Sequence, residues 1–163
     1  MITKDGPRVL EYNVRFGDPE SQSLLSLLES DLAQIMIACA DGRLKDVDVK
    51  ASSKSAATVV VAAPGYPDSY PKGITMTLDE TPPGNIILIV NDQPLTPFLD
   101  VTLFHAGTTL ADGILKTSGG RVIAATATAD SLQDAITKAY DGVKCIHFDG
   151  MQYRKDIGAR ALR

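Results

Sequence analysis

Two oxygen-bearing side chains near the start of the chain, Glu11 and Asn13, have the types and spacing that could support chemistry. In an extended segment, side chains two positions apart point to the same face, so this carboxylate and this amide would be presented together. Hard oxygen donors of this kind are ligands that Mg²⁺ accepts in proteins. Arg15 continues the same spacing and could bind a phosphate group through its planar guanidinium. The pattern predicts a metal–phosphate site.

The residues that follow predict a helix N-terminus beside this site. Asp18 is a favourable N-cap, Pro19 suits the first helical position, and Glu20 would lie near the positive end of the helix dipole. Unpaired backbone N–H groups at such an end attract anions. The same residue types also fit a simpler hypothesis, in which a solvated strand edge is followed by a capped helix and binds nothing. Spacing alone leaves both hypotheses open.

The element expected to position this site is a strand over residues 8–14, where β-favouring side chains alternate with polar ones. Its apolar face would enter a core through Leu10, Tyr12 and Val14. A single helix should then run from about residue 19 to residue 40 and end at Asp41-Gly42. Its apolar face recurs at three- and four-residue steps and comprises Leu24, Leu25, Leu28, Leu32, Ile35, Met36 and Cys39.

The remainder of the chain predicts a small sheet closed by a helix. Strands are expected over residues 57–63, 74–78, 86–90, 101–105, 114–117 and 121–128. Turns at Asp112-Gly113 and at residues 118–120 indicate an antiparallel meander. Ser131 is expected to open a second helix, whose apolar face comprises Leu132, Ala135, Ile136, Ala139, Tyr140 and Val143. The fold class is therefore α+β with an α/β-like start: a strand and a long helix, then a mostly antiparallel sheet with a packing helix.

Other reactive residue types have a structural explanation that competes with a functional one. His105 follows a predicted strand and is expected to be a structural hydrogen bonder rather than a base. Residues 118–121, Ser-Gly-Gly-Arg, lack the spacing of a Walker motif and are expected to form a hairpin turn. Cys39 and Cys145 are far apart in apolar surroundings, so we expect buried, reduced thiols rather than a disulfide or a metal site.

Composition excludes several classes of protein. The 163 residues, 44% hydrophobic and 22% charged, are typical of one globular domain or two small ones. A formal net charge of −4 gives no general attraction to nucleic acid or to anionic membranes. Residues 1–8 do not form a signal peptide, and the apolar runs are too short to span a membrane. We therefore expect a cytoplasmic protein with neither a nucleic-acid nor a membrane partner.

Several ordered motifs carry a resemblance to a known family. The segment Glu11–Glu20, E-Y-N-V-R-F-G-D-P-E, resembles the last ATP-grasp strand of the phosphoribosylamine–glycine ligase (glycinamide ribonucleotide synthetase) family. Four later motifs are similar to the family's and occur in its order: G-Y-P-D-S-Y-P-K-G from Gly65, F-H-A-G-T from Phe104, G-G-R-V from Gly119 and H-F-D-G-M-Q-Y-R-K-D-I-G from His147. The resemblance covers the chain except for about residues 82–99.

The resemblance implies an ATP-dependent ligase that joins glycine to 5-phosphoribosylamine in de novo purine synthesis. It implies that Glu11 and Asn13 are ligands of Mg²⁺ or Mn²⁺, and that Arg15 is a catalytic residue near the phosphoryl groups. Asp18 and Glu20 would border the substrate pocket. It also implies two units: the end of the ATP-grasp domain over residues 1–50, and the family's C-terminal domain over residues 51–163.

Two departures from the family pattern bear on activity. The chain starts where the family's catalytic domain is nearly finished, without the amine-binding domain, the ATP lid or the adenine-binding segment. We therefore expect no ligase activity from this chain without the missing N-terminal part. Residues 82–99 form a longer link than is usual in the family, which suggests a surface insertion or untranslated sequence carried into a gene model.

Other interpretations stay open beside the main one. A fused aminoimidazole ribonucleotide synthetase could follow the chain, as in some eukaryotic members of the family. The chain could instead belong to another ATP-grasp carboxylate–amine ligase that shares the strand motif. It could also be a stand-alone C-terminal module with a binding or structural role and no catalysis.

Overall fold

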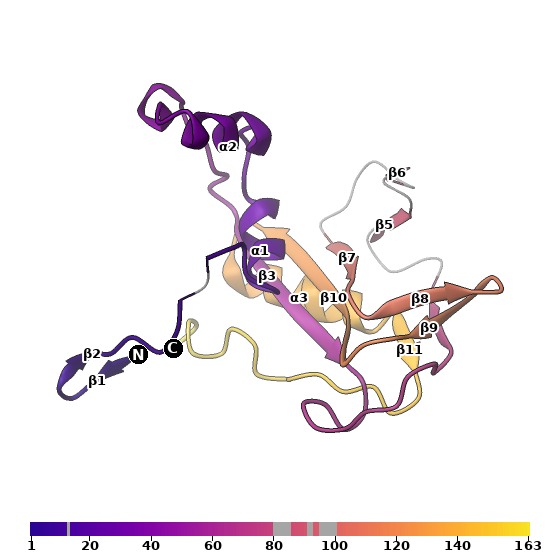
Figure 1. Ribbon diagram of the computed structural model, residues 1–163. Coiled ribbons are helices and arrows are strands. Elements are labelled where there is room, and N and C mark those ends of the chain that lie inside the picture. Colours follow the sequence, from indigo (N-terminus) through magenta and orange to yellow (C-terminus); the bar gives the residue numbers. More distant parts are fainter. Residues whose placement is uncertain (13, 80–85, 91–92, 95–100) are drawn as a thin grey trace.

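The computed structural model describes residues 1–12, 14–79, 86–90, 93–94 and 101–163, and its centre is one mostly antiparallel sheet (Figure 1). The strand order is β3-β10-β7-β5-β6, with β5 parallel to β7 and the other neighbours antiparallel. The strands are β3 (Ser55–Ala62), β5 (Ile86–Val90), β6 (Gln93–Pro94), β7 (Val101–His105) and β10 (Arg121–Ala129). The predicted α+β class is confirmed, but the simple meander is wrong, because β10 lies between β3 and β7.

Helix α3 (Leu132–Val143) covers one face of this sheet and creates the core. Ser131 caps the helix as predicted, since its hydroxyl accepts a hydrogen bond from the backbone N–H of Asp134 at 3.1 Å. Alternate side chains of β3 and β10 point toward α3 and are buried: Ala57, Val59, Val61, Ile123, Ala125 and Ala127. A Cβ on Gly142 would lie 2.6 Å from the side chain of Val101, so this glycine allows α3 to approach β7 closely.

A β-bulge interrupts the pairing of β3 with β10. The register runs without a gap from Ala129 to Ile123, which pairs with Val61, and then skips Val122, so that Arg121 pairs with Ala62. In a regular strand Arg121, two positions before Ile123, would share the α3 face with it, because side chains alternate. The bulge instead places Arg121 on the opposite face of the sheet, in line with Ala62.

Shorter elements complete the second half of the chain. The hairpin of β8 (Thr108–Ala111) and β9 (Ile114–Thr117) turns at Asp112-Gly113, as predicted, with positive φ at both residues. Strands β4 (Met76–Leu78) and β11 (Ile146–Phe148) pair antiparallel. Residues 118–120 are not the predicted hairpin turn, because they join β9 to β10, which lie in different sheets.

The predicted strand over residues 8–14 is wrong for the residues described there. Regular pairing is confined to β1 (Ile2–Thr3) and β2 (Gly6–Pro7), and residues 8–12 and 14 form no strand. Three side chains expected to enter a core are exposed instead: Leu10 73%, Tyr12 83% and Val14 95%. A strand needs a neighbouring strand and a face to bury, and the described residues offer this segment neither.

The predicted long helix is two helices, α1 (Glu20–Ser26) and α2 (Leu32–Ala40). The first ends because its following residues bond elsewhere: Ser52 N–H donates to Leu27 O at 2.7 Å, and Glu29 N–H donates to Lys50 O at 3.0 Å. Asp31 then caps α2 by accepting from the backbone N–H of Gln34 at 3.1 Å. The stop at Asp41-Gly42 is confirmed, and the 3₁₀ turn η1 (Leu44–Asp46) follows.

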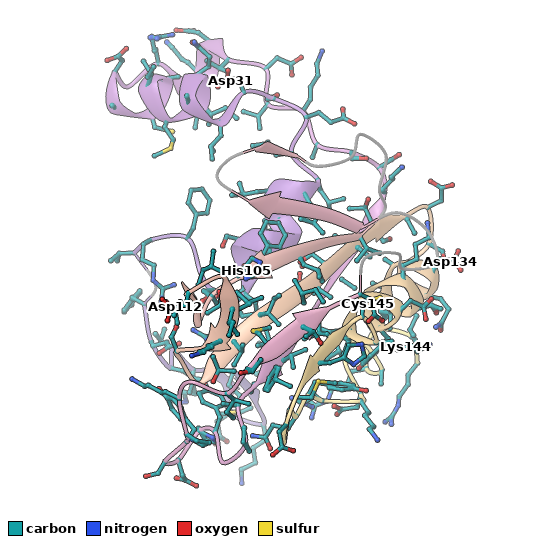
Figure 2. All side chains as sticks on the ribbon, turned by 90° about the vertical axis from the view of Figure 1, so that its right-hand side faces the viewer. Asp31, His105, Asp112, Asp134, Lys144 and Cys145 are labelled. Carbon is teal, nitrogen blue, oxygen red and sulfur yellow. The ribbon has the colours of Figure 1, made fainter. Side chains whose placement is uncertain are left out.

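Apolar exposure divides the described chain near residue 50. Thirteen large hydrophobic residues up to Val49 are exposed, against four beyond it, and the buried core lies almost entirely in the second part. Helix α2, with Asp31 at its start, stands apart from the sheet in both views (Figures 1 and 2). Cys39 on α2 is exposed, so its predicted burial is wrong, whereas Cys145 is buried as expected. Exposure of this many large apolar side chains is typical of a region that packs against another surface.

The remaining sequence expectations concern membranes and the 82–99 segment. Within the ranges that the structure describes, every helix is too short or too polar to traverse a lipid bilayer. Of the predicted insertion, only β5 and β6 belong to the described residues, and the other positions of 82–99 lie outside them.

Candidate functional site

The predicted metal–phosphate residues lie in an exposed segment before α1. Glu11 and Arg15 are both exposed, and Arg15 donates through Nη1 to the carbonyl oxygen of Phe16 at 3.0 Å. Asn13 lies outside the described residues. Within the described ranges, no three His, Cys, Asp or Glu side chains are grouped to hold a metal ion. The described residues therefore do not form a metal site by themselves, and any such site needs further ligands.

The turn into α1 is built differently from the prediction. Pro19 is the N-cap residue and makes no side-chain capping bond, so the predicted cap by Asp18 is wrong. Asp18 Oδ1 instead accepts from Nε2 of Gln22 at 3.1 Å. The hydroxyl of Ser21 donates to Gly17 O at 2.6 Å and anchors the turn to the helix. Glu20 occupies the first turn of α1, as predicted.

Arg121 of β10 reaches this turn from 103 residues away in sequence. Its Nη1 donates to the backbone oxygen of Asp18 at 2.7 Å, and its Nη2 lies 3.3 Å from Asp18 Oδ2. Both side chains are partly exposed. The Ser-Gly-Gly-Arg run, expected to be only a turn, therefore ends in an arginine that binds the predicted substrate-bordering residue.

A cavity of about 520 Å³ opens beside this contact. Residues from four of the resembling motifs, and from the face of β3 that points away from α3, line it: Pro19, Thr58, Val60, Ala62, Tyr66, Pro67, Arg121, Gln152, Tyr153, Arg154 and Ile157. In Figure 1 the loop after β3 and the C-terminal segment run side by side below the sheet. Motifs that are far apart in sequence thus converge on one place in the fold.

The two arginines that line the cavity are both paired with aspartates. Arg121 is paired with Asp18, and Arg154 makes bonds of 2.9 and 2.6 Å to the carboxylate of Asp156. The hydrogen bond from Arg154 lowers the pKa of Asp156 below its ordinary value. The positive charge at the cavity is therefore balanced, and its wall is otherwise largely apolar. Such a wall suits packing against another protein segment better than capture of a free anion.

Two aromatic rings and one glycine shape the adjoining loop. Tyr66 and Tyr70 lie with ring centroids 6.2 Å apart and tilted by 58°. A Cβ on Gly120 would collide with Tyr66 and would lie 2.8 Å from Tyr70 Cε1. Gln152 fastens the same loop to the C-terminal segment, since its Nε2 donates to Ala63 O at 3.1 Å and to Tyr66 O at 2.8 Å.

His105 has the contacts of a structural residue. Its Nδ1 lies 2.9 Å from the hydroxyl of Thr108, across the turn between β7 and β8. Loss of solvent around the ring lowers the pKa of His105, although the residue as a whole remains exposed. The neutral form is therefore favoured, in a position well suited to holding the turn.

Sequence reasoning missed the contact between Arg121 and Asp18 and the role of Gln152. The available signal was that Asp18, Arg121 and Gln152 each lie within a family-like motif, and polar residues of such motifs often meet at one site. Strand spacing could not reveal Arg121, since the bulge reverses the face to which it points.

The fold and the cavity define a compact α+β domain whose sheet carries a helix on one face and a loop-lined recess on the other. The family model for the phosphoribosylglycinamide synthetase C domain matches residues 56–160. The chain belongs to this family, and the resemblance inferred from the motifs is confirmed.

Relatives and a solved structure agree with this assignment. The chain is 49% identical over 162 residues to the bifunctional purine biosynthetic protein ADE1 of Schizosaccharomyces pombe, covering 99% of this chain and 19% of that protein. It is 44% identical to the phosphoribosylamine–glycine ligase of Chlorobaculum tepidum, covering 99% of this chain and 35% of that ligase. The crystal structure of the phosphoribosylamine–glycine ligase of Thermotoga maritima matches with a TM-score of 0.67 and 32% identity, over 96% of this chain and 34% of that one. The chain thus spans about a third or less of each.

Proposed function

We propose that this chain is the C-terminal part of an enzyme that joins glycine to 5-phosphoribosylamine, with hydrolysis of ATP to ADP and phosphate. The supporting observation is that the match to ligase relatives covers 99% of the chain, including the N-terminal 55 residues that precede the C-domain match. The similarity therefore extends across Glu11, Arg15, Asp18 and Glu20, and is not confined to the packed sheet.

Within that enzyme we propose distinct roles for the predicted site residues. Glu11 and Asn13 would supply two oxygen ligands to Mg²⁺ or Mn²⁺, which escorts ATP. Arg15 would stabilise the phosphoryl group that activates the glycine carboxylate as an acyl phosphate. Asp18 and Glu20 would border the pocket in which 5-phosphoribosylamine attacks. The other metal ligands and the nucleotide pocket would come from outside this chain.

The exposed apolar residues support a boundary near residue 50. The segment before it exposes Val9, Leu10 and Tyr12, and the apolar side chains of α1 and α2 are largely uncovered as well. Burying this surface against an ATP-grasp domain would restore a strand over residues 8–14 and would position Glu11. We propose that residues 1–50 belong to that domain and residues 51–163 to the C domain.

A fused second enzyme and a cytoplasmic location of the full-length protein both remain predictions. The relatives include a bifunctional protein and shorter ligases, so a fused aminoimidazole ribonucleotide synthetase is compatible with the match but is not required by it. A cytoplasmic location follows from purine synthesis in the family and likewise remains a prediction.

The experiment compares this chain with the full-length product of its gene. Release of ADP is measured with ATP, glycine and 5-phosphoribosylamine, leaving out each substrate in turn. The full-length protein should need all three, and the chain of residues 1–163 should show no turnover and no tight binding of Mg²⁺-ATP by calorimetry. A full-length protein that uses a different amine or carboxylate would overturn the assignment. Turnover by the chain of residues 1–163 alone would overturn the proposal that the nucleotide pocket comes from outside this chain.

A further inference from the structure

We propose that Arg121 is a positioning residue that holds the turn carrying Asp18 and Glu20 in its working geometry. The proposal rests on the substrate-bordering role given above to that turn. Arg121 itself is assigned no contact with substrate, and it acts through the backbone and side chain of Asp18.

The β-bulge is the first observation behind this inference. Thr126 pairs with Thr58 and Arg121 pairs with Ala62, so that Arg121 shares the sheet face on which α1 lies. Val122 is the extra residue that produces this change of face. Bulges commonly redirect a side chain next to a functional site. Here the redirected side chain is the one that reaches the turn before α1.

The backbone around Arg121 is held tightly, which gives the arginine a fixed base. Gly107 N–H donates to Val122 O at 2.9 Å, and Ser118 N–H donates to Gly107 O at 2.7 Å. A Cβ on Gly107 would lie 2.6 Å from Gly119 Cα, so the two turns approach as closely as glycine permits. The motifs F-H-A-G-T and G-G-R-V thereby brace each other, and Arg121 follows directly from that brace.

The contact with Asp18 is suited to positioning rather than to overall stability. An isolated, partly exposed ion pair contributes little to the free energy of folding. The 2.7 Å bond to Asp18 O, however, fixes the main chain of the turn itself. The guanidinium makes this bond and faces Oδ2 at the same time, which one ammonium group cannot reproduce with equal geometry. Loss of Arg121 should therefore release the turn and leave the sheet intact.

The first experiment uses residues 1–163 and needs no ligase activity. Arg121→Gln is compared with Arg43→Gln, a matched control in which the lost arginine forms a 3.0 Å ion pair of similar exposure with Asp41. Trypsin cleavage after Arg15 should become at least about fivefold faster in Arg121→Gln, since Arg15 is already exposed but the held turn restricts the residues after it that the protease must also bind, while the urea midpoint stays at the wild-type value. Arg121→Lys should give an intermediate rate. Equal cleavage rates in wild type and Arg121→Gln would overturn the inference, as would an unfolding midpoint lowered in proportion to the cleavage rate.

The second experiment places Arg121→Gln in the full-length protein. The value of kcat/KM for glycine and for 5-phosphoribosylamine should fall about tenfold, because a small misplacement of positioning groups is costly, while KM for ATP and the Tm stay within error. Arg121→Lys should recover part of the loss. Full activity in Arg121→Gln would overturn the inference and leave the proposed function standing. A full-length wild type without ligase activity would overturn the proposed function, and the cleavage rates would still decide whether Arg121 holds the turn.

Discussion

The hydroxyl oxygen of Ser23 on α1 lies 2.6 Å from that of Thr58 on β3, which in turn lies 2.8 Å from the hydroxyl oxygen of Thr126 on β10. Thr126 is 2% exposed, so its hydroxyl depends on this bond for a partner. The three residues connect α1 to the face of the sheet opposite α3. This chain of hydroxyls joins the exposed N-terminal part to the packed C-terminal part.

Removing the hydroxyl of Thr58 alone should destabilise the protein more than removing the hydroxyls of Thr58 and Thr126 together. Thr58→Val leaves the buried Thr126 hydroxyl without its partner and should lower the free energy of unfolding by about 1–3 kcal/mol. Thr58→Val combined with Thr126→Val removes both groups and should recover part of that loss. Urea unfolding of the two variants, with Thr58→Ser as a control that keeps the hydroxyl, measures the difference. A double variant less stable than Thr58→Val would contradict the expectation.

Gly120 should tolerate no side chain while Tyr66 and Tyr70 keep their places. Gly120→Ala would push a methyl group into both rings and should cost about 1–3 kcal/mol, as overpacking commonly does. Tyr66→Ala in the same chain should relieve part of that cost. A thermodynamic cycle of the two substitutions, measured by thermal unfolding, would show strong coupling. Additive effects would mean that the tyrosine ring moves aside freely.

Glu11 should matter to the full-length ligase through its metal. Glu11→Gln is expected to raise the Mg²⁺ concentration needed for half-maximal activity by about 100-fold or more, since even outer-sphere partners of ligands cost 10–100-fold. Glu29→Gln, an exposed glutamate in the link between α1 and α2, serves as the control. Titration of activity with Mg²⁺ and with Mn²⁺ makes the test. Normal activity of Glu11→Gln at ordinary Mg²⁺ would remove Glu11 from the proposed ligands.

The two cysteines should react with thiol reagents at very different rates. Cys39 is exposed on α2, whereas burial raises the pKa of the Cys145 thiol, with smaller contributions from Asp79 and Asp141. Because the thiolate is the reactive form, Cys145 should react only when the protein unfolds. Alkylation followed by peptide mapping, with and without urea, distinguishes the two. Cys39→Ser should abolish the fast reaction, and fast labelling of Cys145 in native protein would contradict its burial.

His105 should make stability depend on pH in mildly acidic solution. Its pKa is lowered from 6.5, so the unfolded chain binds a proton more readily than the folded one. The stability associated with the neutral ring is thus complete above pH 6.5 and declines as the pH falls toward the folded-state value. His105→Asn should flatten this decline, by a small amount because solvent screens the partly exposed ring. Urea unfolding between about pH 5 and pH 8 tests it. An unchanged profile would argue against the lowered pKa.

The second half of the fold could be predicted well from the sequence. Ser131 predicts the start of α3 as its N-cap, and the periodicity of Ala135, Ile136 and Ala139 identifies the buried face of the helix. The strands β5, β7 and β9 match their predicted residue ranges. These elements are specified by local patterns, and the strands with which β5, β7 and β9 pair lie within the same chain, as does the sheet on which α3 packs.

The first half could not be predicted in the same way. Alternation over residues 8–14 indicates a strand, but a strand forms only beside a neighbour, and here Leu10 and Tyr12 remain exposed. The break between α1 and α2 carried a local signal in Asp31, which was outweighed by the continuous apolar periodicity on either side. The contact between Asp18 and Arg121 depends on one extra residue in β10, and no periodicity reveals such a residue in advance.

The bulge at Val122 decides on which side of the sheet Arg121 emerges, because in a regular strand Arg121 and Ile123, two positions apart, would share one side. Conservative exchanges at Val122 should leave that choice untouched. Deleting the position would keep Arg121 opposite Ala62, because adjacent side chains alternate, but it would remove the carbonyl oxygen of Val122 that accepts from the N–H groups of Ala106 and Gly107. For engineering, the buried side chain at Val122 can therefore be exchanged conservatively, whereas the length of the segment from Arg121 to Ile123 should be kept.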